Sequence, residues 1–291
     1  MKPLLRRCAR TVATTGLALL TSLGAASALG ACAGDGGGED DDGTSTTGRR
    51  VVLTTTVAPA ALTFVNEEGW SIEVRRAAVS VGALHYFSGE PIEGAEEARL
   101  APRPAPARSM LGQLARGLAI GEAHAHPGHY AEGDARGEML APTSVDLAAG
   151  PVAIGAGEGI TGLVRSARFT WGASPTGPLA ADLGGSVVLV EGRAAREGEA
   201  RSFRLRAGAS DLPDGDVTVD GCVFERAEIE GDGAVTLTID PAVWLAGADF
   251  EEAPEGTEEE PADVPAGTQP ANAFLRGLAK GGAFHVRFDP S

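Results

Sequence analysis

The chain has 291 residues, with 40 acidic and 24 basic side chains and therefore a formal net charge of −16. This charge argues against nucleic acid and anionic membrane surfaces as partners, because both require a positive footprint. The 41 glycines and 18 prolines disfavour a helical bundle, since both residue types interrupt helix interiors. An apolar content of 43% is still sufficient for the core of one domain.

Residues 1–31 have the pattern of an export signal. Four basic residues precede position 11, and an uncharged stretch rich in Ala, Leu, Thr and Gly follows them. The stretch ends in Leu29-Gly30-Ala31-Cys32, which resembles the lipobox of bacterial lipoprotein precursors. The resemblance implies that Cys32 is lipidated and becomes the mature N-terminus. The alternative is an ordinary cleaved signal in which the cysteine is coincidental.

The lipobox resemblance implies a lipid-anchored protein of the cell envelope. Ala33 is not the aspartate that often retains lipoproteins at the inner membrane, which favours the outer membrane in a diderm cell. Residues 32–49 contain almost no apolar side chains, so we predict a disordered acidic and glycine-rich tether. Only Cys222 would remain as a free thiol, and we predict it to be a small buried residue.

From Arg50 onward the dominant pattern is a short alternation of apolar and polar residues, which is typical of strands with one buried face. The alternating runs lie at 72–74, 79–87, 203–205, 235–239 and 284–288, and Val187–Val190 is a continuous apolar run. The sequence therefore predicts a mainly β fold over residues 50–291. The simplest arrangement is an antiparallel β-sandwich with a few short helices and long loops. The core is predicted to include Trp70, Trp171 and Trp244.

Short helices are predicted at three places, namely 110–120, 240–247 and 270–280. The second begins with Asp240-Pro241, an N-cap followed by proline at the first helical position. Loop excursions are predicted near 89–109 and 248–269. We interpret the acidic residues of the second excursion as a solvated loop, because no ligand spacing typical of a calcium site accompanies them. The glycine-dense segment 155–159 is interpreted as a loop or a bulge.

Three of the five histidines fall within six residues, at His124, His126 and His129. A random window of this length would hold about 0.1 histidines, so the cluster requires a physical explanation. His124 and His126 would share one face of an extended strand, and Pro127-Gly128 favours a turn that brings His129 close to them. Neutral imidazoles suit zinc, copper(II) or nickel. The sequence therefore predicts a site for a divalent transition metal.

Neighbouring side chains are candidates for further ligands or for groups that orient an imidazole. They are Glu122, Glu132, Asp134 and Glu138, together with His85. His85 alternates with apolar residues, and this position favours a core histidine over a ligand. The remaining histidine, His285, is predicted to be exposed on the polar face of the last strand. The alternative for the whole cluster is a solvated turn whose histidines bind no metal.

Three hypotheses about function remain open. The favoured one is a lipid-anchored envelope protein that captures or buffers a metal ion, or transfers it to a transporter, without turnover. The second is a structural or interaction lipoprotein that docks another envelope protein without metal. The third is a zinc-dependent hydrolase or lyase in which Glu132 or Glu138 acts as general base. The sequence contains no nucleophile elbow, phosphate-binding loop or dinucleotide fingerprint that would point to another chemistry.

Overall fold

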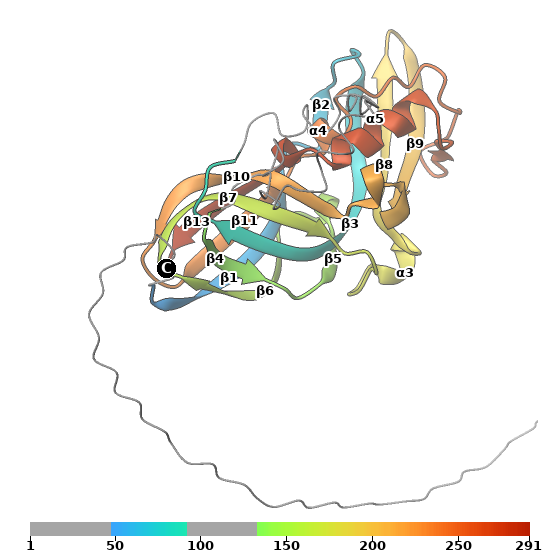
Figure 1. The fold of residues 1–291 in the computed structure, drawn as a ribbon. Coiled ribbons are helices and arrows are strands. Elements are labelled where there is room, and N and C mark those ends of the chain that lie inside the picture. The colour runs from blue at the N-terminus through green and yellow to red at the C-terminus, as the bar shows by residue number, and fades with distance from the viewer. Residues whose placement is uncertain (1–47, 92–132) are drawn as a thin grey trace, which may run out of the picture. The chain divides into compact units, whose positions relative to one another are not determined.

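The computed structural model describes residues 48–91 and 133–291, which lie in the unit formed by residues 44–291. Within the described residues, thirteen strands join into a single mixed sheet accompanied by three short α-helices (Figure 1). The leader, the tether up to residue 47 and the helix predicted at 110–120 lie outside this part of the chain. The prediction of a mainly β fold with a few short helices is confirmed.

Eight of these strands close the sheet on itself. They are β1 (Arg50–Pro59), β3 (Ser71–Phe87), β4 (Ala135–Met139), β6 (Val152–Ile160), β7 (Gly162–Trp171), β10 (Thr218–Ile229), β11 (Gly233–Ile239) and β13 (Phe284–Pro290). Their hydrogen-bonded order is β3-β4-β6-β1-β11-β13-β10-β7, and β7 pairs again with β3. Figure 1 shows these strands wrapped around a common interior.

The first half of β3 extends into a second group of strands. That group contains β2 (Thr63–Val65), β8 (Ser186–Arg196), β9 (Glu199–Gly208) and β12 (Ala262–Asp263), while β5 (Thr143–Asp146) pairs with the middle of β3. Residues 71–79 of β3 pair with β8, and residues 81–87 pair with β7. One strand of 17 residues therefore belongs to both groups.

Two of the three described α-helices begin where the sequence predicts them, and the third, at residues 180–183, is not predicted. The α-helices are α3 (Ala180–Leu183), α4 (Pro241–Trp244) and α5 (Gln269–Leu278), and the 3-10 helices are Leu147–Ala149, Ala209–Asp211, Pro213–Gly215 and Gly281–Ala283. The Asp240 carboxylate accepts a hydrogen bond from the Ala242 N–H at 2.9 Å, which confirms the predicted N-cap of α4. Helix α5 packs its apolar face against α4, where the Trp244 and Phe274 rings meet edge to face.

Alternation of side chains places part of the core inside the closed sheet. On β1, Val51, Leu53 and Val57 point inward and are buried. Facing them, β6 contributes glycines, and a Cβ at Gly159 would lie 2.8 Å from the Leu53 Cδ1. The glycine-dense segment is thus a strand with a bulge, and its missing side chains make room for the leucine. All three tryptophans and Cys222 are buried, as predicted.

The pairing differs from that of an antiparallel sandwich in two respects. Three pairs, β1–β11, β10–β13 and β9–β12, are parallel, and one continuous sheet takes the place of two separate sheets. The physical reason is that alternation specifies which face of a strand is buried, but it does not specify the neighbour or its direction. A closed sheet and a sandwich therefore leave the same pattern in the sequence.

Candidate functional site

Most of the predicted metal ligands lie outside the described residues. These are His124, His126 and His129 together with Glu122 and Glu132, and Cys32 of the lipobox is likewise outside. The described candidates are His85, Asp134 and Glu138, all on or next to the β3–β4 hairpin. The histidine segment belongs to the chain that connects these two strands. The hairpin is therefore the part of the structure that bears on the predicted site.

The base of this hairpin is fixed by hydrogen bonds. The Ser88 N–H donates to the Asp134 carbonyl oxygen at 3.0 Å, and the Asp134 N–H donates to the Ser88 Oγ at 2.9 Å. Gly133 has a φ of 70°, and a Cβ there would lie 2.7 Å from the Gly89 nitrogen, so glycine is required. The Asp134 carboxylate pairs with Arg136 at 3.3 Å. Asp134 therefore stabilises the base of the hairpin, through its backbone bonds to Ser88 and its ion pair with Arg136.

His85 and Glu138 face each other across β3 and β4. They are directly paired in the ladder, and the His85 Nε2 lies 3.7 Å from a Glu138 carboxylate oxygen. Their side chains are 30% and 49% exposed, so the pair lies at the surface. The His85 Nδ1 is buried and has no hydrogen-bond partner in the described part of the chain. One ring nitrogen and one carboxylate are thus held close together on two neighbouring strands.

The structure corrects the predicted position of His85 in the core. Val79 and Val81 are buried, but the ladder between β3 and β7 shifts register between Val81 and Leu84. Beyond this irregularity Leu84 and Tyr86 become the fully buried residues, so His85 takes the opposite face. A one-residue shift exchanges the two faces of a strand. The apolar residues on both sides of the shift hid it in the sequence.

A row of charged side chains crosses the outer face at this level. His85 is also the ladder partner of Arg168 on β7, and the Arg168 Nε contacts the Asp220 carboxylate on β10 at 2.7 Å. The Arg168 guanidinium lies 5.5 Å from the centre of the Phe87 ring, which stacks with the His85 ring. A carboxylate thus lies at each end of a row that crosses four neighbouring strands, with His85 and Arg168 between the two carboxylates. Local sequence could not show this row, because its members are far apart in the chain.

These residues do not form a metal centre by themselves. Transition-metal sites use three or four protein ligands, whereas His85 and Glu138 supply two. Within residues 48–91 and 133–291, no three His, Cys, Asp or Glu side chains converge on a common point. The chemistry of the pair does fit a supporting role, because a carboxylate beside an imidazole can orient the ring or add one ligand.

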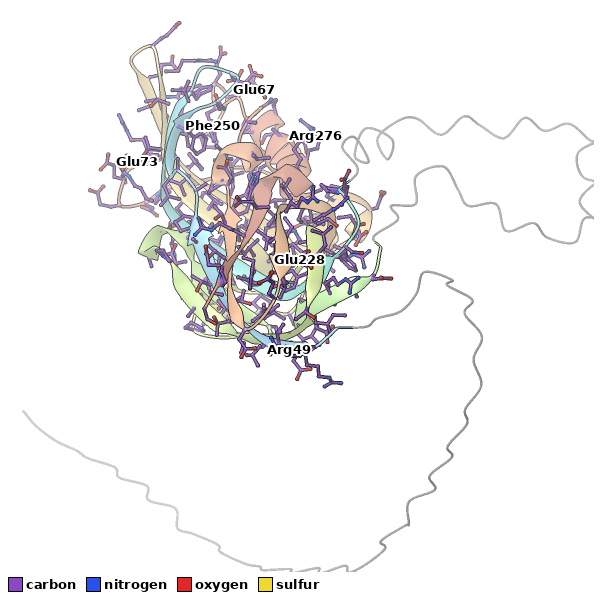
Figure 2. All side chains as sticks on the ribbon, turned by 90° about the vertical axis from the view of Figure 1, so that its left-hand side faces the viewer. Arg49, Glu67, Glu73, Glu228, Phe250 and Arg276 are labelled. Carbon is purple, nitrogen blue, oxygen red and sulfur yellow. The ribbon has the colours of Figure 1, made fainter. Side chains whose placement is uncertain are left out.

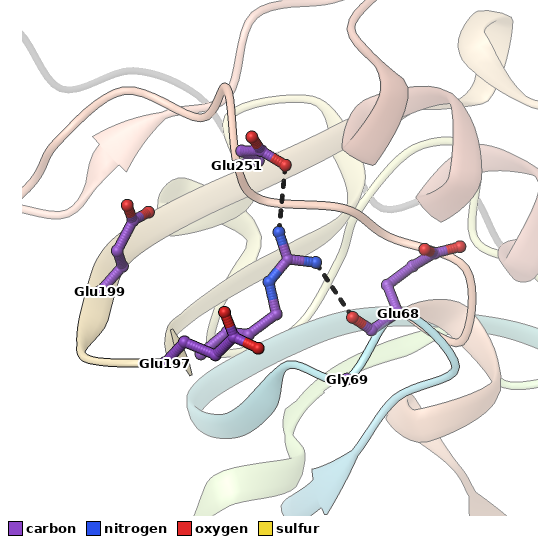
Figure 3. A pocket seen from close by; sticks show the side chains of 6 residues that line it. Glu68, Gly69, Glu197, Glu199 and Glu251 are labelled. Atoms are coloured by element: carbon purple, nitrogen blue, oxygen red, sulfur yellow. Dashed lines mark hydrogen bonds and ion pairs between the residues drawn. The ribbon is translucent and has the colours of Figure 1, made fainter.

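A cavity of about 580 Å³ opens at the end of the second group of strands. Figure 3 shows Glu197 and Glu199 on the β8–β9 turn, with Glu251 on the opposite wall. The Arg196 guanidinium donates to the Glu68 carbonyl oxygen at 3.1 Å and to Glu251 at 3.2 Å. It also lies 4.4 Å from the centre of the buried Trp70 ring. Arg196 therefore joins three segments of the chain.

A second cavity, of about 310 Å³, lies on the outer faces of β10, β11 and β13. His285 and Arg287 line it beside Thr236 and Thr238, which are their ladder partners. His285 is exposed, as predicted from its position on the last strand. Neither cavity contains a cysteine or a serine that could act as a nucleophile.

No family model, no curated protein and no solved structure matches the chain. The fold is consequently no guide to function, and the argument rests on the site residues. Among the residues that the structure describes, no helix combines the length and the apolar content needed to span a membrane.

Proposed function

We propose that this chain is a lipid-anchored protein of the cell envelope that binds a divalent transition metal for capture, buffering or transfer. The ligands are His124, His126 and His129, and the metal is zinc, copper(II) or nickel. The observation that carries the proposal is the occurrence of these three histidines within six residues of the chain connecting β3 to β4. The anchor is the lipid on Cys32, as the lipobox resemblance implies.

The geometry of the hairpin supports this proposal. Four residues lead from His129 to Gly133, and a chain of that length spans at most about 14 Å. Gly133 is held against Ser88 and Gly89 at the hairpin base. A chain of this length permits His129 to approach the strand ends, near which His85 and Glu138 lie. Those two side chains are suited to complete or to orient the ligand set.

The charge of the protein supports the same proposal. A net charge of −16 raises the local concentration of divalent cations at the surface. The chain has only three methionines, so a thioether-rich copper(I) site is disfavoured. The single mature cysteine outside the lipobox, Cys222, is buried in the core and is not accessible to a metal.

Calorimetric titration with Zn²⁺, using the mature chain purified without a histidine tag, tests the proposal. The triple variant His124→Ala, His126→Ala, His129→Ala should lose at least about tenfold in affinity, because its three ligands are gone. His285→Ala is the matched control, since it removes an exposed imidazole on another strand and should leave the titration unchanged. Equal affinity of the triple variant and the parent chain would refute the assignment.

Two further measurements separate the alternatives. Absence of metal by elemental analysis, together with partner binding that resists chelation, would favour a structural or interaction lipoprotein. Zinc-dependent hydrolysis that is lost in Glu138→Gln at unchanged zinc affinity would favour the hydrolase.

For the anchor, Cys32→Ser should leave the precursor uncleaved and unlipidated. Normal processing of that variant to a soluble protein would instead indicate an ordinary signal peptide.

A further inference from the structure

The outer face of β3, β8 and β9 carries a concentration of arginines, although the protein as a whole is acidic. We define the arginine face as Arg75, Arg76, Arg193 and Arg204. In the ladder, Glu191 lies between Arg76 and Arg204. Figure 2 shows Glu73, the ladder partner of Arg193, on the outside of this sheet, with Phe250 on the side of the core.

An acidic segment of the same chain lies along this face. We define the acidic strap as residues 251–263, which end in β12. Glu258 contacts the Arg75 Nη2 at 3.0 Å and the Arg193 Nε at 4.0 Å, and Asp263 contacts the Arg204 Nη1 at 3.5 Å. The strap thus neutralises arginines that come from three different strands.

The strap bends at Glu258, where the Thr257 N–H donates to the Glu260 carbonyl oxygen at 3.1 Å, and its last residues run beside β9. Ala262 pairs in parallel with Phe203, and the Val264 N–H donates to the Arg204 carbonyl oxygen at 2.9 Å. Only two residues of the strap take part in this ladder. At Gly256 a Cβ would collide with the backbone of Ser202 and of Ala262. Glycine at this position therefore permits the close approach of the strap to the edge of β9.

The ion pairs that hold the strap are of an exchangeable kind. The Glu258 and Asp263 side chains are 59% and 73% exposed, and exposed ion pairs contribute little to stability. If the strap left, Arg193 would lose the only ion-pair partner that the described residues give it, and Arg75 would keep only Glu73. Four arginines would then face the carboxylates of Glu73, Asp182 and Glu191.

We propose that the arginine face is a docking surface for a short acidic segment of another protein, for which the strap is the competing intramolecular occupant. The strap itself shows which chemistry covers the face, namely carboxylates on a short segment whose last residues add to β9. The overall negative charge repels long polyanions, so the occupant must be short and make its contacts at close range. The proposal uses no residue of the histidine segment and stands independently of the proposed function.

Because the strap is tethered, its effective concentration at the face is high, on the order of millimolar. A free segment must therefore outcompete it, and the native chain should bind such a segment weakly. Removal of the Glu258 and Asp263 charges should weaken the binding of the strap to the arginine face. It should not disturb the sheet, because both side chains are exposed.

The test uses a fluorescein-labelled peptide with the sequence of residues 251–263 and follows its anisotropy on addition of protein. The double variant Glu258→Gln, Asp263→Asn should bind the peptide at least about tenfold more tightly than the native chain does. Adding Arg75→Gln and Arg193→Gln should abolish binding. The matched control adds Arg226→Gln and Arg276→Gln, which change the net charge equally at exposed positions on β10 and α5 and should leave binding intact.

Hydrogen exchange of the native chain provides a second readout that needs no substitution. Saturating peptide should accelerate exchange of the Val264 amide, which holds the end of the strap to β9. Failure of the double variant to bind the peptide at low ionic strength would overturn the proposal. Equal binding by the Arg75/Arg193 variant and by its charge-matched control would overturn it as well, since the peptide would then respond to net charge alone.

Discussion

The closed sheet should become less stable in mildly alkaline solution, because two of its core side chains must stay protonated. Cys222 and Tyr86 are fully buried inside the sheet. Burial raises the pKa of Cys222 from 9.0 to about 12 and the pKa of Tyr86 from 10.0 to about 12. The folded state therefore holds both protons more tightly than the unfolded state does. Stability is fully present below about pH 9 and falls as the pH rises.

The size of the effect follows from linkage. Each group with a raised pKa in the folded state lowers the free energy of unfolding by about 1.4 kcal/mol per pH unit, once the pH exceeds its pKa in the unfolded state. Between pH 9 and pH 11, Cys222 accounts for about 2 kcal/mol and Tyr86 for about 1 kcal/mol, so the free energy of unfolding should fall by about 3–4 kcal/mol.

Urea unfolding followed by tryptophan fluorescence at several pH values measures this loss, because all three tryptophans are buried. Cys222→Ala should lower stability at pH 8 by about 1 kcal/mol through the lost contacts, but its pH dependence should be flatter. Tyr86→Phe should flatten the curve above about pH 10. Parallel curves for the native chain and the Cys222 variant would refute the reasoning, since burial of the thiol would then cause no linkage.

Three further predictions address packing, capping and the strap. Gly277→Ala should lower the free energy of urea unfolding by about 1–3 kcal/mol, because the new Cβ would lie 2.5 Å from the Trp244 Cα. Asp240→Ala should cost about 1 kcal/mol in the same assay, because the N-cap of α4 is lost, whereas Asp240→Asn should retain most of the stability. A hydrogen bond from Arg75 lowers the pKa of Glu258 below 4.5, so docking of the strap should be complete above that value. It should weaken as the pH falls through the lowered pKa, and this is measurable as faster exchange of the Val264 amide.

The strands and their buried faces could be predicted from sequence alternation, but their neighbours could not. On β11, Val235, Leu237 and Ile239 are buried as the pattern predicts. The same residues pair in parallel with β1 and antiparallel with β13, and nothing within seven residues of sequence encodes that choice. Register depends on burial over the whole sheet, so the closed arrangement is a property of long-range packing.

The ion pairs of the acidic strap could not be predicted from the sequence either. Its carboxylates are exposed, in agreement with the prediction of a solvated segment. Their partners Arg75 and Arg193 precede them by 183 and 65 residues, so no window of sequence contains both charges of an ion pair. Composition indicates a charged surface, but only the fold shows that the acidic strap forms ion pairs with arginines of the same chain.

For the candidate site, the sequence identifies the histidine cluster, whereas only the structure shows that His85 and Glu138 face each other. The cluster of His124, His126 and His129 is evident from spacing alone, and it remains a prediction because these residues lie outside the described ranges. The opposition of His85 and Glu138 was not evident, because it depends on the register between β3 and β4. Both residues were candidates by sequence, but only pairing brings them within 3.7 Å.

The two proposals involve different parts of β3 and different physics, so salt can separate them. Arg75 lies in the half of β3 that pairs with β8, and His85 lies in the half that pairs with β7, beyond the register shift. Docking of an acidic segment on the arginine face is a Coulombic interaction between exposed groups and must weaken as ionic strength rises. Coordination of a metal by neutral imidazoles is a short-range bond that salt screens far less. Peptide docking and metal binding that weakened equally with ionic strength would therefore contradict at least one of the two proposals.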